Sequence, residues 1–287
     1  CAGCAETSYA RLITQLFGEN MYISNATGCS SIWGGPAATC PYTINKDSKK
    51  GPAWANSLFE DNAEHGLGMY VGQKFIRDSL IAKLNEIASN CETSDSLKAA
   101  IAKFMETKDS TIENQEPTKA LIAELEKLDC CCKDEILEKK AYLNKKSVWI
   151  MGGDGWAYDI GFGGLDHVLA SGENVNVMVF DTEMYSNTGG QASKASNIGE
   201  VCQFAAAGKD IGKKSLAEIA MSYGYVYVAQ IALGANPAQA LKAIQEAEAY
   251  NGPSLIIGYA PCELHGVKGG MNHCQDEMKA AVKAGYW

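Results

Sequence analysis

The sequence lacks a continuous apolar run long enough to cross a bilayer, and its N-terminus lacks a basic segment followed by an apolar one. We therefore expect no membrane association and no secretory signal. Basic residues are also in the minority, because 25 Lys and Arg accompany 34 Asp and Glu, for a net charge of −9. A nucleic-acid-binding protein would normally have a basic face, so we do not expect a nucleic-acid partner.

Cysteine, by contrast, is abundant, with 11 residues in a chain of 287. A small secreted protein would use them for disulfides, but the odd number and the lack of an export signal favour a reducing compartment with some cysteines binding metal. The length suits one large α/β domain or two small ones. Because the sequence begins at Cys1 rather than Met and ends at Trp287, we expect a piece of a longer chain.

The first part of the chain combines helical patterns with an unusual loop. Apolar spacing predicts a helix over residues 9–17, and an apolar run predicts a strand over 21–26. Residues 28–50 are rich in Gly, Pro, Ser and Thr but too apolar for a linker, so we expect an ordered loop at a site. A long helical pattern follows over 54–89.

Residues 91–146 are rich in Lys, Glu, Ala and Leu and contain one Pro. They predict two or three solvent-facing helices that form an insertion in a single domain spanning 1–287. Cys130, Cys131 and Cys132 lie in this segment. Three adjacent residues on a helix point in three directions, so we expect an incidental role for them rather than one shared metal ion.

From residue 147 onward, short apolar runs alternate with helical patterns. The runs cover 148–151, 175–180, 225–231 and 255–259, and the helical patterns cover 161–170, 215–223 and 237–250. Apolar strands separated by helices predict an α/β fold, a parallel sheet with helices on both faces. Ligands of such sheets bind at the carboxyl ends of the strands, where Asp154, Asp181 and Cys262 are expected.

Residues 152–155 read Gly-Gly-Asp-Gly and come directly after a predicted strand. Glycines there let the backbone approach phosphate oxygens, and an Asp adds a hard oxygen ligand suited to magnesium on a diphosphate. A dinucleotide-binding turn is the alternative. Gly161 comes too late for its third glycine, but Asp181 is at about the right distance for its acid, so the glycines alone leave both readings open.

The next strand ends in Asp181 and is followed by the polar run 182–190. A Gly-Asp-Gly turn followed at this distance by polar residues resembles thiamine diphosphate enzymes. The resemblance implies that Asp154, the Thr182 hydroxyl and the Met184 carbonyl bind magnesium. The family usually has Asn at the second position, so Thr182 departs from its pattern. Two ordinary strand-end turns are the simpler alternative.

Cys1 and Cys4 are spaced to ligate one centre, and Cys29 and Cys262 each follow a predicted strand. Four thiolates satisfy a four-iron cluster, although they could equally bind a structural zinc ion. The remaining cysteines outside 130–132 are interpreted as packing or incidental residues, namely Cys40, Cys91, Cys202 and Cys274. His65, His167, His265 and His273 lie in no catalytic pattern, and the last two are possible loop contacts.

Five segments resemble pyruvate:ferredoxin (flavodoxin) oxidoreductase, in its C-terminal thiamine diphosphate-binding domain. They are CAGCAET at 1–7, ATGCSSIWGG at 26–35, GDGWAYDIG at 153–161, YSNTGGQ at 185–191, and the surroundings of Cys262. The resemblance implies a [4Fe-4S] cluster on Cys1, Cys4, Cys29 and Cys262. It also implies a cofactor site made of Glu6, Cys29, Gly153, Asp154, Gly155, Trp156, Thr182, Glu183, Met184, Tyr185, Ser186 and Asn187. Asn187 would contact the substrate.

The implied reaction is oxidative decarboxylation of pyruvate to acetyl-CoA and CO2, with electrons passing to the cluster and then to ferredoxin or flavodoxin. Pyruvate, coenzyme A and the remaining domains of the parent chain are the implied partners, in a homodimer located in the cytoplasm or in an organelle of an anaerobic eukaryote. The family activates thiamine with a glutamate from another domain. We therefore expect this chain alone to bind cofactor weakly and to be inactive.

Three other readings remain. The chain could be the β subunit of a multi-subunit 2-oxoacid:ferredoxin oxidoreductase, which shares the cofactor and cluster. It could instead be a non-redox thiamine diphosphate decarboxylase or synthase domain, which would not need the four cysteines. A non-enzymatic binding module is the third reading.

Overall fold

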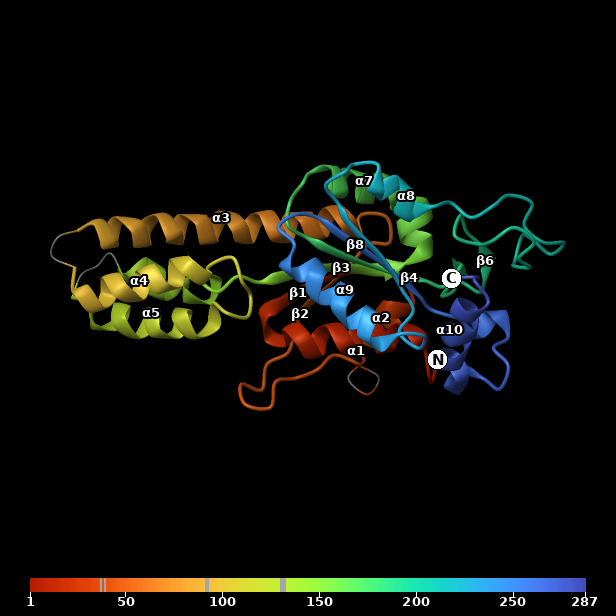
Figure 1. Ribbon diagram of the computed structural model, residues 1–287, viewed down its shortest axis with the longest axis horizontal. Coiled ribbons are helices and arrows are strands. Elements are labelled where there is room, and N and C mark those ends of the chain that lie inside the picture. The colour runs from red at the N-terminus through yellow and green to blue at the C-terminus, as the bar shows by residue number, and fades with distance from the viewer. Residues whose placement is uncertain (37, 39, 91–92, 130–132) are drawn as a thin grey trace. The chain divides into compact units, whose positions relative to one another are not determined.

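The computed structural model describes residues 1–36, 38, 40–90, 93–129 and 133–287. The chain divides into two compact units (Figure 1). The first consists of Cys1–Leu67 and Val148–Trp287, and the second of Gly68–Ser147. The sheet belongs to the first unit, and the second unit is helical.

A six-stranded parallel sheet forms the centre of the first unit. Its strands, in spatial order, are β2 (Ala53–Ser57), β1 (Met21–Ala26), β3 (Ser147–Gly153), β4 (Asn176–Asp181), β8 (Ser254–Tyr259) and β7 (Tyr227–Ile231). β3, β4 and β8 are buried almost throughout, as expected for parallel strands covered on both faces. The predicted α/β fold is confirmed.

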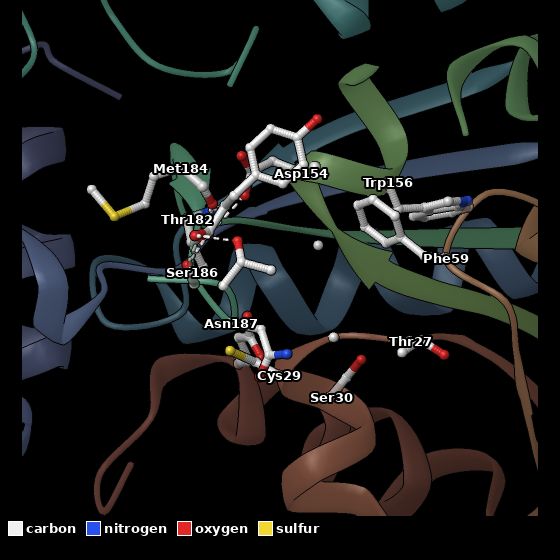
Figure 2. A pocket seen from close by; sticks show the side chains of 16 residues that line it. Thr27, Cys29, Ser30, Phe59, Asp154, Trp156, Thr182, Met184, Ser186 and Asn187 are labelled. Atoms are coloured by element: carbon white, nitrogen blue, oxygen red, sulfur yellow. Dashed lines mark hydrogen bonds between the residues drawn. The ribbon is translucent and has the colours of Figure 1, made fainter. Parts of the chain in front are cut away.

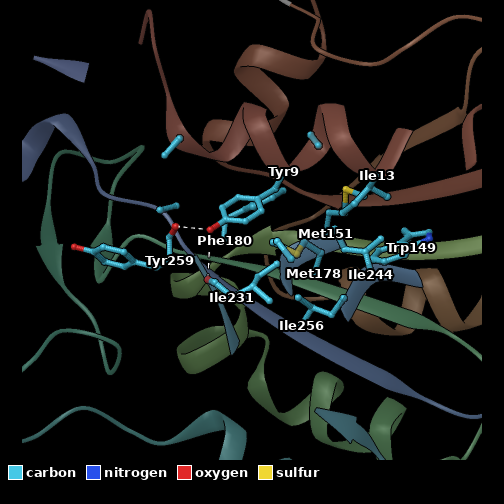
Figure 3. Packing of buried hydrophobic residues seen from close by; sticks show 14 of the residues in the cluster. Tyr9, Ile13, Trp149, Met151, Met178, Phe180, Ile231, Ile244, Ile256 and Tyr259 are labelled. Carbon is cyan, nitrogen blue, oxygen red and sulfur yellow. Dashed lines mark hydrogen bonds between the residues drawn. The ribbon is translucent and has the colours of Figure 1, made fainter. Parts of the chain in front are cut away.

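One face of the sheet packs on α1 (Ala5–Phe17), α9 (Pro237–Ala249) and α10 (Cys274–Lys283). Figure 3 shows Tyr9 and Ile13 of α1 and Ile244 of α9 against Met151, Phe180 and other strand side chains. The Tyr9 hydroxyl donates to the carbonyl of Tyr259 at 2.8 Å, so its buried oxygen is satisfied. This core fixes α1, and with it the segment around Cys4 and Glu6, next to the strand ends.

The opposite face carries α7 (Phe162–Ala170) and α8 (Leu216–Met221) (Figure 1). The start of α3 (Asn62–Ser89) also packs against the sheet, close to Ile150. A Cβ atom on Gly66 would lie 2.4 Å from Ile150 Cγ1, so only glycine permits this approach. The sheet is therefore covered on both faces, as predicted.

The second unit contains the rest of α3 together with α4 (Asp95–Thr107), α5 (Gln115–Lys127) and α6 (Asp134–Glu138). Leu84, Phe104, Leu121 and other apolar side chains form its own buried core. The insertion expected over 91–146 lies within this unit. Cys91 and Cys130–Cys132 fall outside the residues that the structure describes, so their expected roles remain predictions.

Two expectations for the first unit are corrected. The helix expected from Trp54 onward begins only at Asn62, because 53–57 pairs with β1 as strand β2, with Trp54 opposite Ile23. The loop expected over 28–50 begins with a short helix, α2 (Cys29–Gly34). Short elements that were not predicted are η1 (Gly18–Asn20), η3 (Lys140–Tyr142), β5 (Met184–Tyr185), β6 (Gln191–Ala192), η5 (Glu263–His265) and η6 (Met271–His273).

None of the helices in the described residues combines the length and the apolar character that crossing a membrane requires.

Candidate functional site

The candidate site lies at the point in the sheet where successive strands are added first on one side of β1 and then on the other. From β1 the sheet continues to β2 on one side and to β3 and β4 on the other. Ligands of open parallel sheets bind at such a switch point, outside the carboxyl ends of the strands. Thr27, Asp154 and Thr182 directly follow β1, β3 and β4, so they meet at this edge.

A cavity of about 340 Å³ opens between these strand ends (Figure 2). Most of the residues expected at the cofactor line it, namely Glu6, Cys29, Gly153, Asp154, Gly155, Trp156, Thr182, Met184, Tyr185, Ser186 and Asn187. Thr27, Gly28, Ser30, Phe59 and Thr188 complete the wall. Segments from five separate parts of the sequence thus form one cavity with both apolar and polar walls.

Three oxygens gather at one point of this wall, shown by the dashed lines of Figure 2. The Thr182 hydroxyl lies 2.7 Å from Asp154 Oδ1 and 3.0 Å from the Met184 carbonyl oxygen. The Ser186 hydroxyl lies a further 2.7 Å from Thr182 Oγ1. Magnesium takes six oxygens at about 2.1 Å in an octahedron, which puts neighbouring oxygens about 3 Å apart. The three oxygens thus have the spacing and chemistry of magnesium ligands.

Asp154 is almost completely buried, at 1% exposure. Burial, followed by the negative charge of Asp181, raises the pKa of its carboxyl group to about 8. The Ser193 hydroxyl donates to Asp154 Oδ2 at 2.7 Å and orients the carboxylate from behind. A bound cation would favour the ionised form of this carboxyl group, because opposite charge lowers the pKa that burial raises.

Gly155 opens a π-helical turn (Gly155–Ile160) that begins just after Asp154, the residue that follows β3. A Cβ atom at this position would lie 2.6 Å from the Tyr185 ring and 3.3 Å from Phe59. Tyr185 and Phe59 form a tilted aromatic pair with centroids 6.1 Å apart. Glycine is therefore required for the backbone to pass beneath these two rings.

Glu6 is buried at 4% exposure and lines both this cavity and a second one. Burial raises the pKa of its carboxyl group to about 6, and the hydrogen bond from Trp33 opposes that rise. Trp33 Nε1 donates to Glu6 Oε2 at 2.7 Å. The indole itself packs edge-on against Tyr42 and Phe180. The side chain of Glu6 is thus fixed between the two cavities.

The second cavity, of about 260 Å³, brings together Cys1, Cys4, Cys29 and Cys262. Burial raises the pKa of the Cys4 thiol to about 12 and raises the pKa of the Cys29 thiol still further. The negative charge of Glu6 is the second cause of both rises. Among the described residues, no three Cys, His, Asp or Glu side chains are arranged to hold a single metal ion. Four cysteine thiols around one cavity nevertheless have the chemistry of the ligands that four-iron clusters use, since these ligands surround a cube of atoms rather than one ion.

Glu183 is placed differently from the other expected cofactor residues. It does not line the first cavity but a separate one, with Glu200 and His265. Its carboxylate accepts hydrogen bonds from Asn197 at 2.8 Å and Tyr286 at 2.8 Å, and it pairs with Lys213 at 3.2 Å. The described structure therefore does not bring its side chain to the oxygens of Asp154 and Thr182.

Several residues of the site were not predicted from the sequence. Ser193 and Phe59 lie in irregular segments whose approach depends on the fold, and no local pattern marks them. His265, expected only as a possible loop contact, donates from Nε2 to the Thr182 carbonyl at 2.9 Å. Thr27, Gly28 and Ser30 could have been proposed, because Gly28 and Ser30 lie in the segment 28–50 expected to be an ordered loop at a site and Thr27 precedes it.

Comparison with known proteins agrees with this geometry. Residues 138–257 match the family described as thiamine pyrophosphate enzyme, C-terminal TPP binding domain. Over its whole length the chain is 55% identical to the pyruvate:ferredoxin oxidoreductase of Moorella thermoacetica and 55% identical to the pyruvate-flavodoxin oxidoreductase of Klebsiella pneumoniae. It covers 25% and 24% of those proteins, so it spans about a quarter of their length. The resemblance predicted from the sequence is confirmed.

A solved structure has the same fold. It is a 2-oxoglutarate:ferredoxin oxidoreductase from Magnetococcus marinus with 2-oxoglutarate, coenzyme A and succinyl-CoA bound, with a TM-score of 0.52. The match covers 92% of this chain and 64% of that one at 16% sequence identity. At this identity the likeness concerns the fold, and it confirms the expected thiamine diphosphate-binding fold.

Proposed function

We propose that this chain is the thiamine diphosphate- and magnesium-binding portion of a pyruvate:ferredoxin or flavodoxin oxidoreductase. The observation that carries the proposal is the group of oxygens from Asp154, Thr182 and Met184, spaced 2.7 and 3.0 Å apart at the strand ends. An acid, a hydroxyl and a backbone carbonyl with this spacing suit magnesium. The whole-length identity of 55% to two such enzymes supports the choice of family.

In this proposal each part of the chain has a defined role. Asp154, Thr182 and the Met184 carbonyl hold the metal ion, and Ser193 orients Asp154. The backbone from Gly153 to Gly155, with Trp156, Tyr185 and Ser186, accommodates the diphosphate. Thiamine diphosphate supplies, when bound, a nucleophilic carbon for attack on a 2-oxoacid.

Asn187 and Glu6 border both cavities, and this position supports the proposal that they contact substrate and cofactor. Asn187 offers an amide that donates and accepts hydrogen bonds, which suits a polar substrate. Glu6 carries a carboxylate fixed by Trp33. We assign substrate contact to Asn187 and cofactor contact to Glu6, Cys29 and the other lining residues.

The second cavity is proposed to hold a [4Fe-4S] cluster on Cys1, Cys4, Cys29 and Cys262. Such a cluster supplies one-electron transfer. Because Cys29, Thr182, Ser186 and Asn187 line both cavities, the two groups would be separated only by side chains. This arrangement favours an oxidative reaction over a simple decarboxylase.

The reaction of the whole protein is proposed from its relatives. It would convert pyruvate and coenzyme A to acetyl-CoA and CO2 and pass electrons to ferredoxin or flavodoxin. Relatives about four times longer favour one long chain over a separate β subunit. We further propose one thiamine-binding domain with the helical insertion 91–146, a homodimer, and a location in the cytoplasm or an anaerobic organelle.

The test measures thiamine diphosphate binding to the full-length protein by calorimetry, with and without magnesium, after anaerobic purification. We expect binding that requires magnesium and the broad visible absorbance of an iron–sulfur protein. Cys29→Ser should reduce the absorbance, whereas Cys40→Ser, at an exposed cysteine outside both cavities, should not. A colourless protein that contains zinc would contradict the redox function, and magnesium-independent binding would contradict the metal site.

A further inference from the structure

Glu183 lies between two of the proposed magnesium ligands and has an unusual backbone. Its φ angle is +64°, in the left-handed region. Three non-glycine residues of the described chain have positive φ: Lys49, Glu183 and Phe204. Lys49 is exposed and Phe204 is 94% exposed, whereas Glu183 is 3% exposed. A side chain makes this conformation unfavourable, and it persists where surrounding contacts enforce it.

Contacts from three segments enforce the conformation of Glu183. Asn197 and Lys213 donate to Oε1 at 2.8 and 3.2 Å, and the Tyr286 hydroxyl donates to Oε2 at 2.8 Å. The backbone N–H of Glu183 donates to Asp181 Oδ1 at 3.2 Å, and its carbonyl accepts a hydrogen bond from the Ser196 hydroxyl. Both the side chain and the peptide groups of Glu183 are therefore fixed.

Lys213 forms ion pairs with both neighbours of Thr182 in the sequence, Asp181 and Glu183. Its ammonium group lies 2.8 Å from Asp181 Oδ2 and 3.2 Å from Glu183 Oε1, and the Lys213 side chain is only 19% exposed. It also lies over the rings of Trp287 and Tyr158, at 5.2 and 5.8 Å from their centroids. One cation thus bridges the residues that precede and follow Thr182.

The left-handed residue turns the chain sharply between Thr182 and Met184. As a result, the Thr182 hydroxyl and the Met184 carbonyl oxygen lie 3.0 Å apart, and Asp154 Oδ1 lies 2.7 Å from the same hydroxyl. We propose that Glu183 is a positioning residue and not a cofactor contact: its carboxylate, held by Lys213, Asn197 and Tyr286, locks the turn that brings two magnesium ligands together. This inference rests on the proposed function.

The test compares Glu183→Gly with Glu183→Ala in the full-length protein. Both variants lose the carboxylate, but glycine adopts the left-handed conformation freely and alanine does not. A positioning role predicts that the alanine variant binds magnesium about five- to thirtyfold more weakly than the glycine variant, the factor expected from the left-handed penalty. Both should bind more weakly than the wild type, because the turn is no longer locked.

Magnesium affinity is measured by calorimetric titration in the presence of saturating thiamine diphosphate, and the melting temperature is measured without metal. Phe204→Gly and Phe204→Ala are the matched controls, since Phe204 has a φ of +66° but lines neither cavity. They should bind like the wild type. Tyr286→Phe removes one hydrogen bond to Glu183 and keeps the ring, so it provides a milder variant if Glu183→Ala does not fold. It should weaken magnesium binding several-fold.

Equal weakening in the glycine and alanine variants would overturn the inference and indicate a direct contact of the carboxylate. Lower melting temperatures with unchanged affinity would overturn it in favour of a purely structural role. If the wild type binds neither magnesium nor thiamine diphosphate, the proposed function fails and this inference fails with it. Wild-type binding with unaffected variants would refute the inference alone.

Discussion

Replacing Asp154 with asparagine separates its role as a metal ligand from its role in the fold. The two side chains have nearly the same shape, and asparagine keeps one acceptor oxygen but no charge. Asp154 accepts hydrogen bonds from the hydroxyls of Thr182 and Ser193, each at 2.7 Å. Since hydroxyl groups rotate and can also accept, the Ser193 hydroxyl can accept from the amide of an asparagine whose oxygen still faces Thr182.

The expected effect on the metal-free protein follows from the pKa of Asp154, which burial and Asp181 raise to about 8. An unfolded Asp has a pKa of about 3.9, so the folded state binds the proton more tightly. Stability is therefore lost as the pH rises from about 4 to about 8. Between pH 7 and pH 9 the free energy of unfolding of the metal-free wild type should still fall by roughly 1 kcal/mol, and that of Asp154→Asn should not fall.

In the metal-bound protein the ionised carboxylate of Asp154 should raise the free energy of unfolding rather than lower it. Magnesium at a hundred times its dissociation constant stabilises a specific site by about 2.7 kcal/mol. For a domain of this size that corresponds to a rise in melting temperature of about 5–10 °C. Asp154→Asn should abolish this rise, although at pH 7 the metal-free variant should melt close to the metal-free wild type.

The assay is thermal unfolding at pH 7 and pH 9, with and without magnesium and thiamine diphosphate. Asp166→Asn is the matched control, because Asp166 accepts a hydrogen bond from the Tyr223 hydroxyl at 2.7 Å and lies outside the cavity. It should keep the full rise. If Asp154→Asn retains the rise in melting temperature, Asp154 is not a metal ligand. If the metal-free variant loses several kcal/mol at pH 7, the raised pKa is wrong.

Further predictions concern three other positions. Gly155→Ala should weaken thiamine diphosphate binding at least tenfold by calorimetry, because its Cβ would lie 2.6 Å from the Tyr185 ring; unchanged affinity would show that the turn can move. Trp33→Phe removes the donor to Glu6 and should raise the pKa of that carboxyl group above about 6, measured by infrared titration, while a fall would contradict the hydrogen bond. Tyr9→Phe should lower the unfolding free energy by about 1–3 kcal/mol in urea, since the Tyr259 carbonyl loses its buried donor, and a neutral effect would indicate another partner.

The fold was predictable to the extent that its strands are buried on both faces. β3, β4 and β8 appear as continuous apolar runs, and their order with the intervening helices predicts a parallel sheet. β2 lies at the edge of the sheet and is partly exposed, with the mixed sequence Ala-Trp-Ala-Asn-Ser. Its pairing with β1, rather than any local pattern, makes it a strand, so the periodicity predicted a helix there.

The candidate site was predictable where its residues directly follow strands. Asp154 and Thr182 each come one residue after a strand, and parallel strands bring their carboxyl ends to one edge. Ser193 and Lys213 lie in a long irregular segment between β6 and α8, and their contacts with Asp154 and Asp181 depend on the whole fold. The sequence therefore predicted the side chains that face a ligand, but it did not predict the side chains that orient them through hydrogen bonds and ion pairs.

The two cavities share a wall, and this has a consequence for any reaction at the site. Glu6 is fixed by Trp33 beside Cys4 and Cys29, and its charge raises the pKa of both thiols. Through the same electrostatic coupling, a cluster bound by these cysteines would respond to the charge of Glu6, and Glu6 to the oxidation state of the cluster. A gain or loss of charge at Glu6 would therefore act on groups bound in both cavities.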